Sequence, residues 1–178
     1  DFAERTIYLG ADIDLSAYRW ISIGKAGIFF NYPFKGTFDG GGYTISNISQ
    51  EIGSSGYGGL FGYVEGGTVT NVKLENVQIA VTATPVYVGS LISVLKDGVV
   101  TDCVISGNNK IYSEADPSYF YNSGSSFVGD VIGEIRGTNE LIFNIEATDI
   151  DVRYDDFDKF NLNVIINYDE GRNHQNRG

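Results

Sequence analysis

The sequence predicts an all-β protein folded as a parallel β-helix, that is, a β-solenoid of a few coils with loop insertions. Composition is the first observation, because 23 Gly, 12 Tyr and 11 Phe among 178 residues indicate strands and turns. The second is a recurring segment, which appears at Gly59–Val64, Gly89–Leu95 and Gly129–Ile135. Each copy precedes a turn and a short apolar strand that carries one Asn or Asp. Units of this size cannot bury their apolar faces alone, so they must stack.

The residues before the repeats contain further short strands. Apolar and polar residues alternate at Ile7–Leu9, Ile13–Leu15 and Trp20–Ile23, with turn residues between them. A strand, a glycine-rich turn at Asp39–Gly42 and another strand at Tyr43–Ile48 follow. We expect all of these strands to belong to the N-terminal coils.

The repeats share a spacing that predicts the interior. An offset of 31 positions takes Leu60 to Leu91, and an offset of 40 takes Leu91 to Val131 in the third copy. We assign the additional residues to 112–126, a stretch rich in Ser, Asn, Gly and Tyr, as a loop on one side of the solenoid. Because Leu60, Leu91 and Val131 hold the same place in three copies, we expect them to form one interior column.

Four polar residues hold a shared place in the apolar strands. Parallel coils stack about 4.8 Å apart, so these side chains are expected to lie one above another and to hydrogen-bond along the stack. The ionised Asp among them is an acceptor only, which interrupts the pattern of amide donors. We interpret this ladder as structural, and it consists of Asn47, Asn71, Asp102 and Asn144.

Composition and charge argue against several classes of function. A net charge of −11 opposes binding to a phosphate backbone, so no nucleic-acid partner is expected. No apolar run is long enough to span a membrane, so no membrane insertion by this segment is expected. His174 is the only histidine and lies in a polar tail, and one histidine cannot build a multi-histidine metal site. Cys103, the only cysteine, is expected to pack as an inert core residue.

Two segments leave a binding or catalytic role open. As a strand, the acidic stretch 149–158 places Asp151, Arg153 and Asp155 on one face, where carboxylates can hold calcium or act as acid and base. A solvated face with one ion pair explains the same pattern, and we favour it because these acids come from a single late segment. The aromatic segment Ile28–Phe34 is either a platform for a sugar or protein, or a plug for the core, which we favour.

Three stretches carry a resemblance to a known family. Gly59–Gly62 with the turn and strand behind it, Val128–Gly133 and the opening segment resemble the GLUG-motif repeats of bacterial surface proteins, over roughly residues 7–150. The resemblance implies right-handed parallel β-helix segments of large exported proteins, including adhesin-like ones. In these the repeat serves as stalk, spacer or binding surface and has no assigned catalytic residue. The second copy departs from the motif as Gly89–Ser93 and the third carries Asp130, which is tolerable if the motif glycines serve tight turns.

The sequence therefore predicts one β-helix domain over 1–178, with N-terminal coils in 1–55, GLUG-like repeats in 56–150 and a divergent coil or cap with a polar tail in 151–178. The predicted function is a non-catalytic structural or adhesive module of a larger bacterial surface or secreted protein. A fragment of a polysaccharide lyase or glycoside hydrolase is the alternative. We expect no metal or cofactor, an extracellular or cell-surface location, and a host protein, a glycan or adjoining domains of the same polypeptide as partners.

Overall fold

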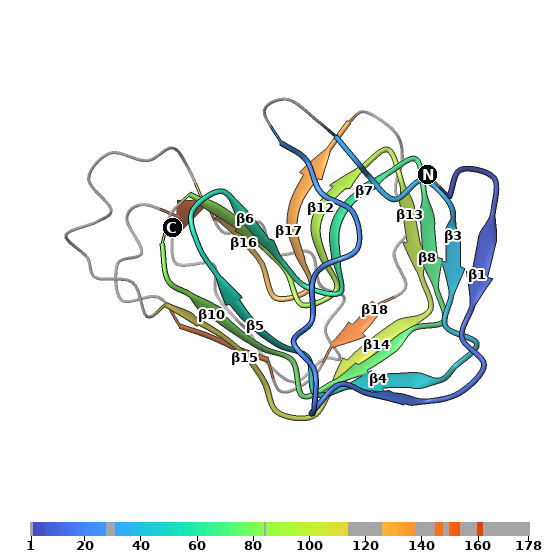
Figure 1. Cartoon of the computed structure of the whole chain (residues 1–178), viewed down its shortest axis with the longest axis horizontal. Helices are drawn as coiled ribbons and strands as arrows, with labels where there is room; N and C mark the ends of the chain where they lie inside the picture. The colour runs from blue at the N-terminus through green and yellow to red at the C-terminus, as the bar shows by residue number, and fades with distance from the viewer. Residues whose placement is uncertain are drawn as a thin grey trace.

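The computed structural model of the chain describes residues 2–27, 31–83, 85–113, 126–137, 145–147, 150–153 and 160–161. Within these ranges all regular secondary structure is β-strand, and the strands form parallel sheets stacked as a β-solenoid of about three turns (Figure 1). The predicted all-β class and the parallel β-helix are confirmed.

The strands follow one another in coils around the solenoid axis (Figure 1). In the described residues, three coils have five strands each, and a coil with fewer strands lies on either side of them. The first coil contributes β1 (Thr6–Tyr8) and β2 (Ile13–Asp14). The second contributes β3 (Thr37–Asp39), β4 (Thr44–Ser46), β5 (Ser49–Ile52), β6 (Gly56–Gly58) and β7 (Phe61–Glu65). The third contributes β8 (Thr68–Thr70), β9 (Lys73–Glu75), β10 (Gln78–Val81), β11 (Val86–Val88) and β12 (Ile92–Lys96). The fourth contributes β13 (Val99–Thr101), β14 (Cys103–Ser106), β15 (Asn109–Ser113), β16 (Ser126–Val128) and β17 (Ile132–Arg136), and a fifth contributes β18 (Ile145–Ala147), β19 (Ile150–Arg153) and β20 (Phe160–Asn161).

Strands at the same place in successive coils pair in parallel and make five sheets, which we number I to V in the order in which the chain visits them. Sheet I has the order β1-β3-β8-β13 and sheet II the order β2-β4-β9-β14-β18. Sheet III is β5-β10-β15-β19, sheet IV is β6-β11-β16-β20 and sheet V is β7-β12-β17. The five sheets surround a common interior, so residues far apart in the sequence become neighbours along the axis (Figure 1).

The register of these sheets confirms the predicted spacing. Thr37 pairs with Thr68 and Thr68 with Val99, an offset of 31 in each case. At β16 and β17 the offset is 40, as in the pairing of Ile92 with Ile132. The additional residues therefore enter between β15 and β16, where the sequence placed them, although residues 114–125 lie outside the described part of the chain.

Corners between the strands explain why each strand is short. Asn47, Asn71, Asn76 and Asp102 have φ values of 61°, 53°, 56° and 53°, in the left-handed region. Asn and Asp enter this region more readily than other residues with a side chain. Each of them ends one strand and turns the chain into the next sheet. For this reason the strand predicted at Tyr43–Ile48 is shorter in the structure, where β4 ends at Ser46 and the next strand, β5, begins at Ser49 beyond the corner at Asn47.

The stretch Trp20–Ile23 was predicted as a strand, and this prediction is wrong. Its only pairing in the described residues is a single parallel bridge from Ile23 to Phe61 of β7. Instead, the Trp20 side chain packs against the core and its indole N–H donates to the carbonyl of Leu60 at 3.3 Å. The stretch therefore covers the core beside sheet V without forming a regular strand.

The interior is a continuous apolar core in which each coil packs on the next. Leu60, Leu91 and Val131 have no exposed surface. The register of β7, β12 and β17 aligns the three residues, because each immediately precedes one of the paired residues Phe61, Ile92 and Ile132. The structure thus places these three residues at equivalent buried positions of successive coils.

Aromatic side chains fill the core near the first coil. Phe34 is 2% exposed, and its ring centroid lies 5.2 Å from that of Phe61, which also meets Phe38 edge-on at 5.3 Å. Phe34 therefore fills the core as the plug interpretation predicts. Tyr32 is 60% exposed, so it does not share that role, and residues 28–30 of the same segment lie outside the described residues.

Gln50 is a buried polar side chain among the apolar residues of the interior. Gln50 occupies in β5 the place that Ile79 and Ile111 hold in the next two coils. Its Nε2 donates to Ser22 Oγ at 3.0 Å and its Oε1 accepts from the Gly59 N–H at 2.8 Å. A buried amide with its hydrogen bonds made avoids most of the desolvation penalty. Gln50 therefore ties the first coil to the second without leaving its own polar atoms unsatisfied.

We predict that Leu91→Ala lowers the free energy of unfolding by about 2–5 kcal/mol, because Leu91 is fully buried between two coils and truncation leaves a cavity. Ile21→Ala is the matched control: Ile21 is 84% exposed, so its truncation should change stability by less than about 0.5 kcal/mol. Urea denaturation measures both. Equal and small effects of the two substitutions would contradict the placement of Leu91 in the core.

Candidate functional site

Polar residues at the corners form two ladders and not the single ladder predicted. Asn71 ends β8, and its Nδ2 donates to Asp39 Oδ1 of the coil below at 3.1 Å. Thr70 pairs with Thr101, so Asp102 holds the equivalent corner in the coil above. The prediction is wrong for Asn47, which lies at the corner between sheets II and III. Asn144 lies outside the described residues.

The second ladder runs along the corner that contains Asn47. Asn47 Nδ2 donates to Asp14 Oδ1 at 2.8 Å, and Asn76 Nδ2 donates to Asn47 Oδ1 at 3.2 Å. Asn76 Oδ1 in turn accepts from the Asn108 N–H at 3.0 Å. The hydrogen bond from Asn47 lowers the pKa of Asp14. Four coils are therefore joined by side chains along one edge of the solenoid.

The sequence could not separate the two ladders by pattern alone. Both corners carry an apolar residue, a polar residue, Asn and an apolar residue, as in Val69–Val72 and Leu74–Val77. Ile45–Ile48 fits both patterns equally well, and only the pairing of Ile45 with Leu74 places Asn47 beside Asn76. Counting back 29 residues from Asn76, in place of the common offset of 31, would have found the match.

Gly62, the second glycine of the first motif copy, serves a close approach between sheets and not a tight turn, whereas Gly59 has φ of 141° at the corner between β6 and β7. Gly62 lies within β7, where a Cβ atom would be 2.4 Å from the Gly24 carbonyl oxygen and 3.1 Å from Tyr57 Cβ. Gly133 holds the equivalent place in β17, and a Cβ there would be 2.6 Å from the Val88 carbonyl oxygen. Between them, Ser93 is small enough to fit and donates to the carbonyl of Gly58 at 2.8 Å. The outer faces of sheets IV and V are therefore in close contact at this position.

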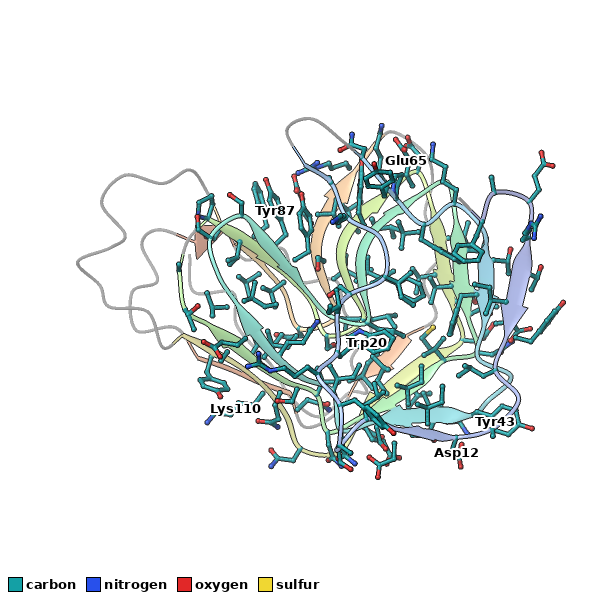
Figure 2. All side chains as sticks on the ribbon, viewed as in Figure 1. Asp12, Trp20, Tyr43, Glu65, Tyr87 and Lys110 are labelled. Carbon is teal, nitrogen blue, oxygen red and sulfur yellow. The ribbon has the colours of Figure 1, made fainter. Side chains whose placement is uncertain are left out.

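An aromatic column follows the outer face of sheet IV beside this contact. The ring centroids of Tyr57 and Tyr87 are 5.1 Å apart and those of Tyr87 and Phe127 are 5.3 Å apart, with the planes nearly parallel. Figure 2 shows Tyr87 between sheets IV and V, where Arg136 of β17 lies 5.3 Å from its ring centroid. Burial raises the pKa of Tyr57. Because the rings cover one another's faces, the column stabilises the stack and offers no broad flat platform along its length.

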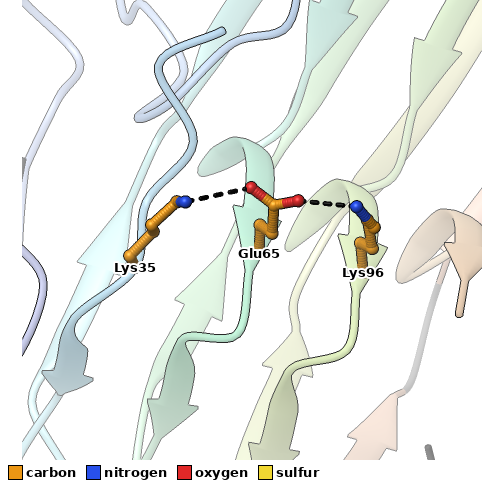
Figure 3. Close-up of polar contacts among 3 residues, drawn as sticks. All are labelled: Lys35, Glu65 and Lys96. Carbon is orange, nitrogen blue, oxygen red and sulfur yellow. Dashed lines mark hydrogen bonds and ion pairs between the residues drawn. The ribbon is translucent and has the colours of Figure 1, made fainter.

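A row of charges lies along the outer end of sheet V. The Glu65 carboxylate forms an ion pair with Lys96 of the next coil at 2.7 Å and another with Lys35 of the previous coil at 3.2 Å (Figure 3). Hydrogen bonding from Lys96 outweighs partial burial and lowers the pKa of Glu65. Three coils are therefore held together by one carboxylate between two ammonium groups.

A depression lies on the outer face of sheet III. It has a volume of about 410 Å³ and combines side chains of the strands β5, β10 and β15 with the segment 16–19 of the first coil. Tyr18 and Tyr112 contribute aromatic rings, whereas Arg19 and Glu51 contribute charges. No local sequence pattern predicts this site, because its residues come from four coils. Its composition, aromatic and polar together, makes it a candidate binding site in the described part of the chain.

The remaining candidate residues show no assembled chemistry in the described ranges. Cys103 is 1% exposed, and burial raises the pKa of its thiol to about 11, so it is not a poised nucleophile. Asp151 and Arg153 lie on β19, which pairs with β15, while Asp155 and His174 lie outside the described residues. Among the residues described, no group of three His, Cys, Asp or Glu side chains is arranged to hold a metal ion. Nor does this part of the chain contain an apolar helix of the length that crosses a bilayer.

Comparison with known proteins finds a similarity over part of the chain. The chain is 39% identical to halomucin of Haloquadratum walsbyi (strain DSM 16790 / HBSQ001) over 83 residues, which cover 40% of this chain. The matched part spans only 1% of the length of halomucin. No family model and no solved structure matches the chain.

We predict that Asn76→Ala is more destabilising than Asn76→Gly, by about 1 kcal/mol. Asn76 has φ of 56°, and alanine is strained in this left-handed conformation because it has a Cβ atom, whereas glycine has none. Both substitutions lose the ladder hydrogen bonds, so their difference isolates the backbone. The order should reverse at Glu75, one residue earlier within β9, where glycine only adds flexibility. Urea denaturation of the four variants tests this, and the same order at both positions would contradict it.

The Glu65 ion pairs predict a pH dependence. Since the folded pKa of Glu65 is lowered from 4.5, its ionisation stabilises the fold above pH 4.5, and this contribution is lost as the pH falls through the folded value. Between pH 7 and pH 3 the wild type should lose more stability than Glu65→Gln, by up to about 1 kcal/mol because the pairs are partly exposed. Glu51→Gln is the control, since the ion pair of Glu51 with Arg19 is exposed and 3.8 Å long. Equal pH responses in all three proteins would refute the stabilising role of Glu65.

Proposed function

We propose that the chain is a non-catalytic structural or adhesive β-solenoid module of a larger surface or secreted protein, and that its repeats are of the GLUG type. The observation that carries the proposal is the use of outward side chains for coil-to-coil contacts. Asn71, Asn76, Glu65 and Tyr87 each bond or stack with a residue in a neighbouring coil. A surface organised in this way favours a rigid, extended element over a catalytic cleft.

The halomucin match supports the same proposal. A similar segment of 83 residues accounts for 1% of that protein, so sequence of this kind occurs within a far longer polypeptide. The solenoid fold and this similarity are both compatible with a surface module. The acidic charge of −11 agrees with a protein that does not engage anionic partners such as nucleic acid.

Location is the direct test. Antibodies against the purified chain should label intact cells of the source organism, and mild protease treatment of those cells should remove the signal while a cytoplasmic marker persists. Labelling that appears only after the cells are opened would contradict a surface role. Detection in the culture medium would support the secreted form of the proposal.

We predict that the chain releases no product from uronate polysaccharides, with or without calcium. The reason is that the described acids and bases are divided among separate ladders and pairs instead of meeting at one point. Ultraviolet absorbance of unsaturated sugars and a reducing-end assay measure this. Turnover that survives repurification and disappears in Arg153→Ala would favour the lyase or hydrolase alternative.

A further inference from the structure

We propose that the depression on sheet III binds a neutral oligosaccharide. The proposal rests on the adhesive form of the proposed function and assigns it a site and a class of ligand. The volume of about 410 Å³ lies within the range of small-ligand sites, roughly 300–1,000 Å³. Its walls come from the first and fourth coils, so the site exists only when the solenoid is folded.

The floor of the depression is a small residue in a column of larger ones. Ala80 of β10 pairs with Glu51 of β5 on one side and with Tyr112 of β15 on the other. Neighbouring parallel strands lie about 4.8 Å apart, so the Cα atoms of Glu51 and Tyr112 lie about 10 Å from each other on either side of the alanine. The missing bulk at Ala80 makes room for a ligand group between them.

Two tyrosines stand at opposite ends of this space. Tyr18, in the first coil, is 69% exposed. Tyr112, in the fourth coil, is half-buried, and Lys110 Nζ lies 4.5 Å from its ring centroid. Figure 2 shows Lys110 on the outer side of sheet III. This cation–π contact occupies one face of the Tyr112 ring and holds its orientation. Tyrosine combines an apolar ring with a hydroxyl, which suits a ligand that has both C–H faces and hydroxyl groups.

The polar lining indicates the class of ligand. Arg19 and Glu51 are 3.8 Å apart and their side chains are 92% and 62% exposed, so their pairing is weak and both keep hydrogen-bonding capacity. Ser49 adds an exposed hydroxyl at the same edge. A ligand rich in hydroxyls can bond to such a mixture, whereas a purely apolar ligand would desolvate these groups without replacing their hydrogen bonds. The chain's charge of −11 favours a neutral saccharide over an acidic one.

The test is a titration of the full chain with maltotriose, cellotriose and trigalacturonate, followed by tryptophan and tyrosine fluorescence and by calorimetry. We expect saturable binding of at least one neutral trisaccharide. Tyr18→Ala and Tyr112→Ala should each weaken that binding at least about tenfold, as the loss of an aromatic anchor does. Ala80→Gln places a larger side chain at the floor of the depression, so it should weaken the binding similarly while leaving the residues of the walls unchanged.

Tyr8→Ala is the matched control, because Tyr8 is 70% exposed, like Tyr18, but does not line the depression. It should leave the affinity unchanged, and circular dichroism should show all variants folded. No saturable binding of either neutral trisaccharide up to millimolar concentrations would overturn the proposal. So would preferential binding of trigalacturonate, or binding that the Ala80→Gln substitution leaves intact. Any of these results would leave the surface-module proposal standing, because cell labelling tests it separately.

Discussion

In-register hydrogen bonding between parallel coils is the constraint on which the rest of this structure depends. Every strand bonds to the strand at the same place in the next coil, so the corners must recur at matching positions. Once the corners coincide, side chains at equivalent positions are brought within contact distance on the inside and on the outside alike. The apolar column through Leu91, the two amide ladders and the charges around Glu65 all follow from this one condition.

Asparagine meets two requirements of such a corner at once. Its backbone tolerates the left-handed conformation that bends the chain, and its side chain carries both a donor and an acceptor. Asn76 uses all of these properties, since it has positive φ, donates to the coil below and accepts from the coil above. An aspartate such as Asp14 can only accept, which suits the end of a ladder, where a single partner lies on one side.

The sequence allowed the fold, the offset of 31 and the site of the insertion to be predicted because these depend on apolar periodicity, which a pattern records directly. The ladder through Asn47 was misassigned because two corners share one local pattern, and the pattern holds no information on which corner is meant. The close approach at Gly62 escaped prediction because contact between two sheets leaves no local signal. The depression around Ala80 escaped prediction for a similar reason, since its walls come from different coils.

The change of offset from 32 at β15 to 40 at β16 shows where this architecture accepts new material. Eight residues more than in the preceding coil enter between sheets III and IV, yet β16 and β17 resume the register of β11 and β12. The cost of closing a longer loop grows only slowly with its length. This edge is therefore a natural acceptor position for grafted peptides, epitopes or whole domains, which would project sideways from a rigid rod while the hydrogen-bonded stack continues past them.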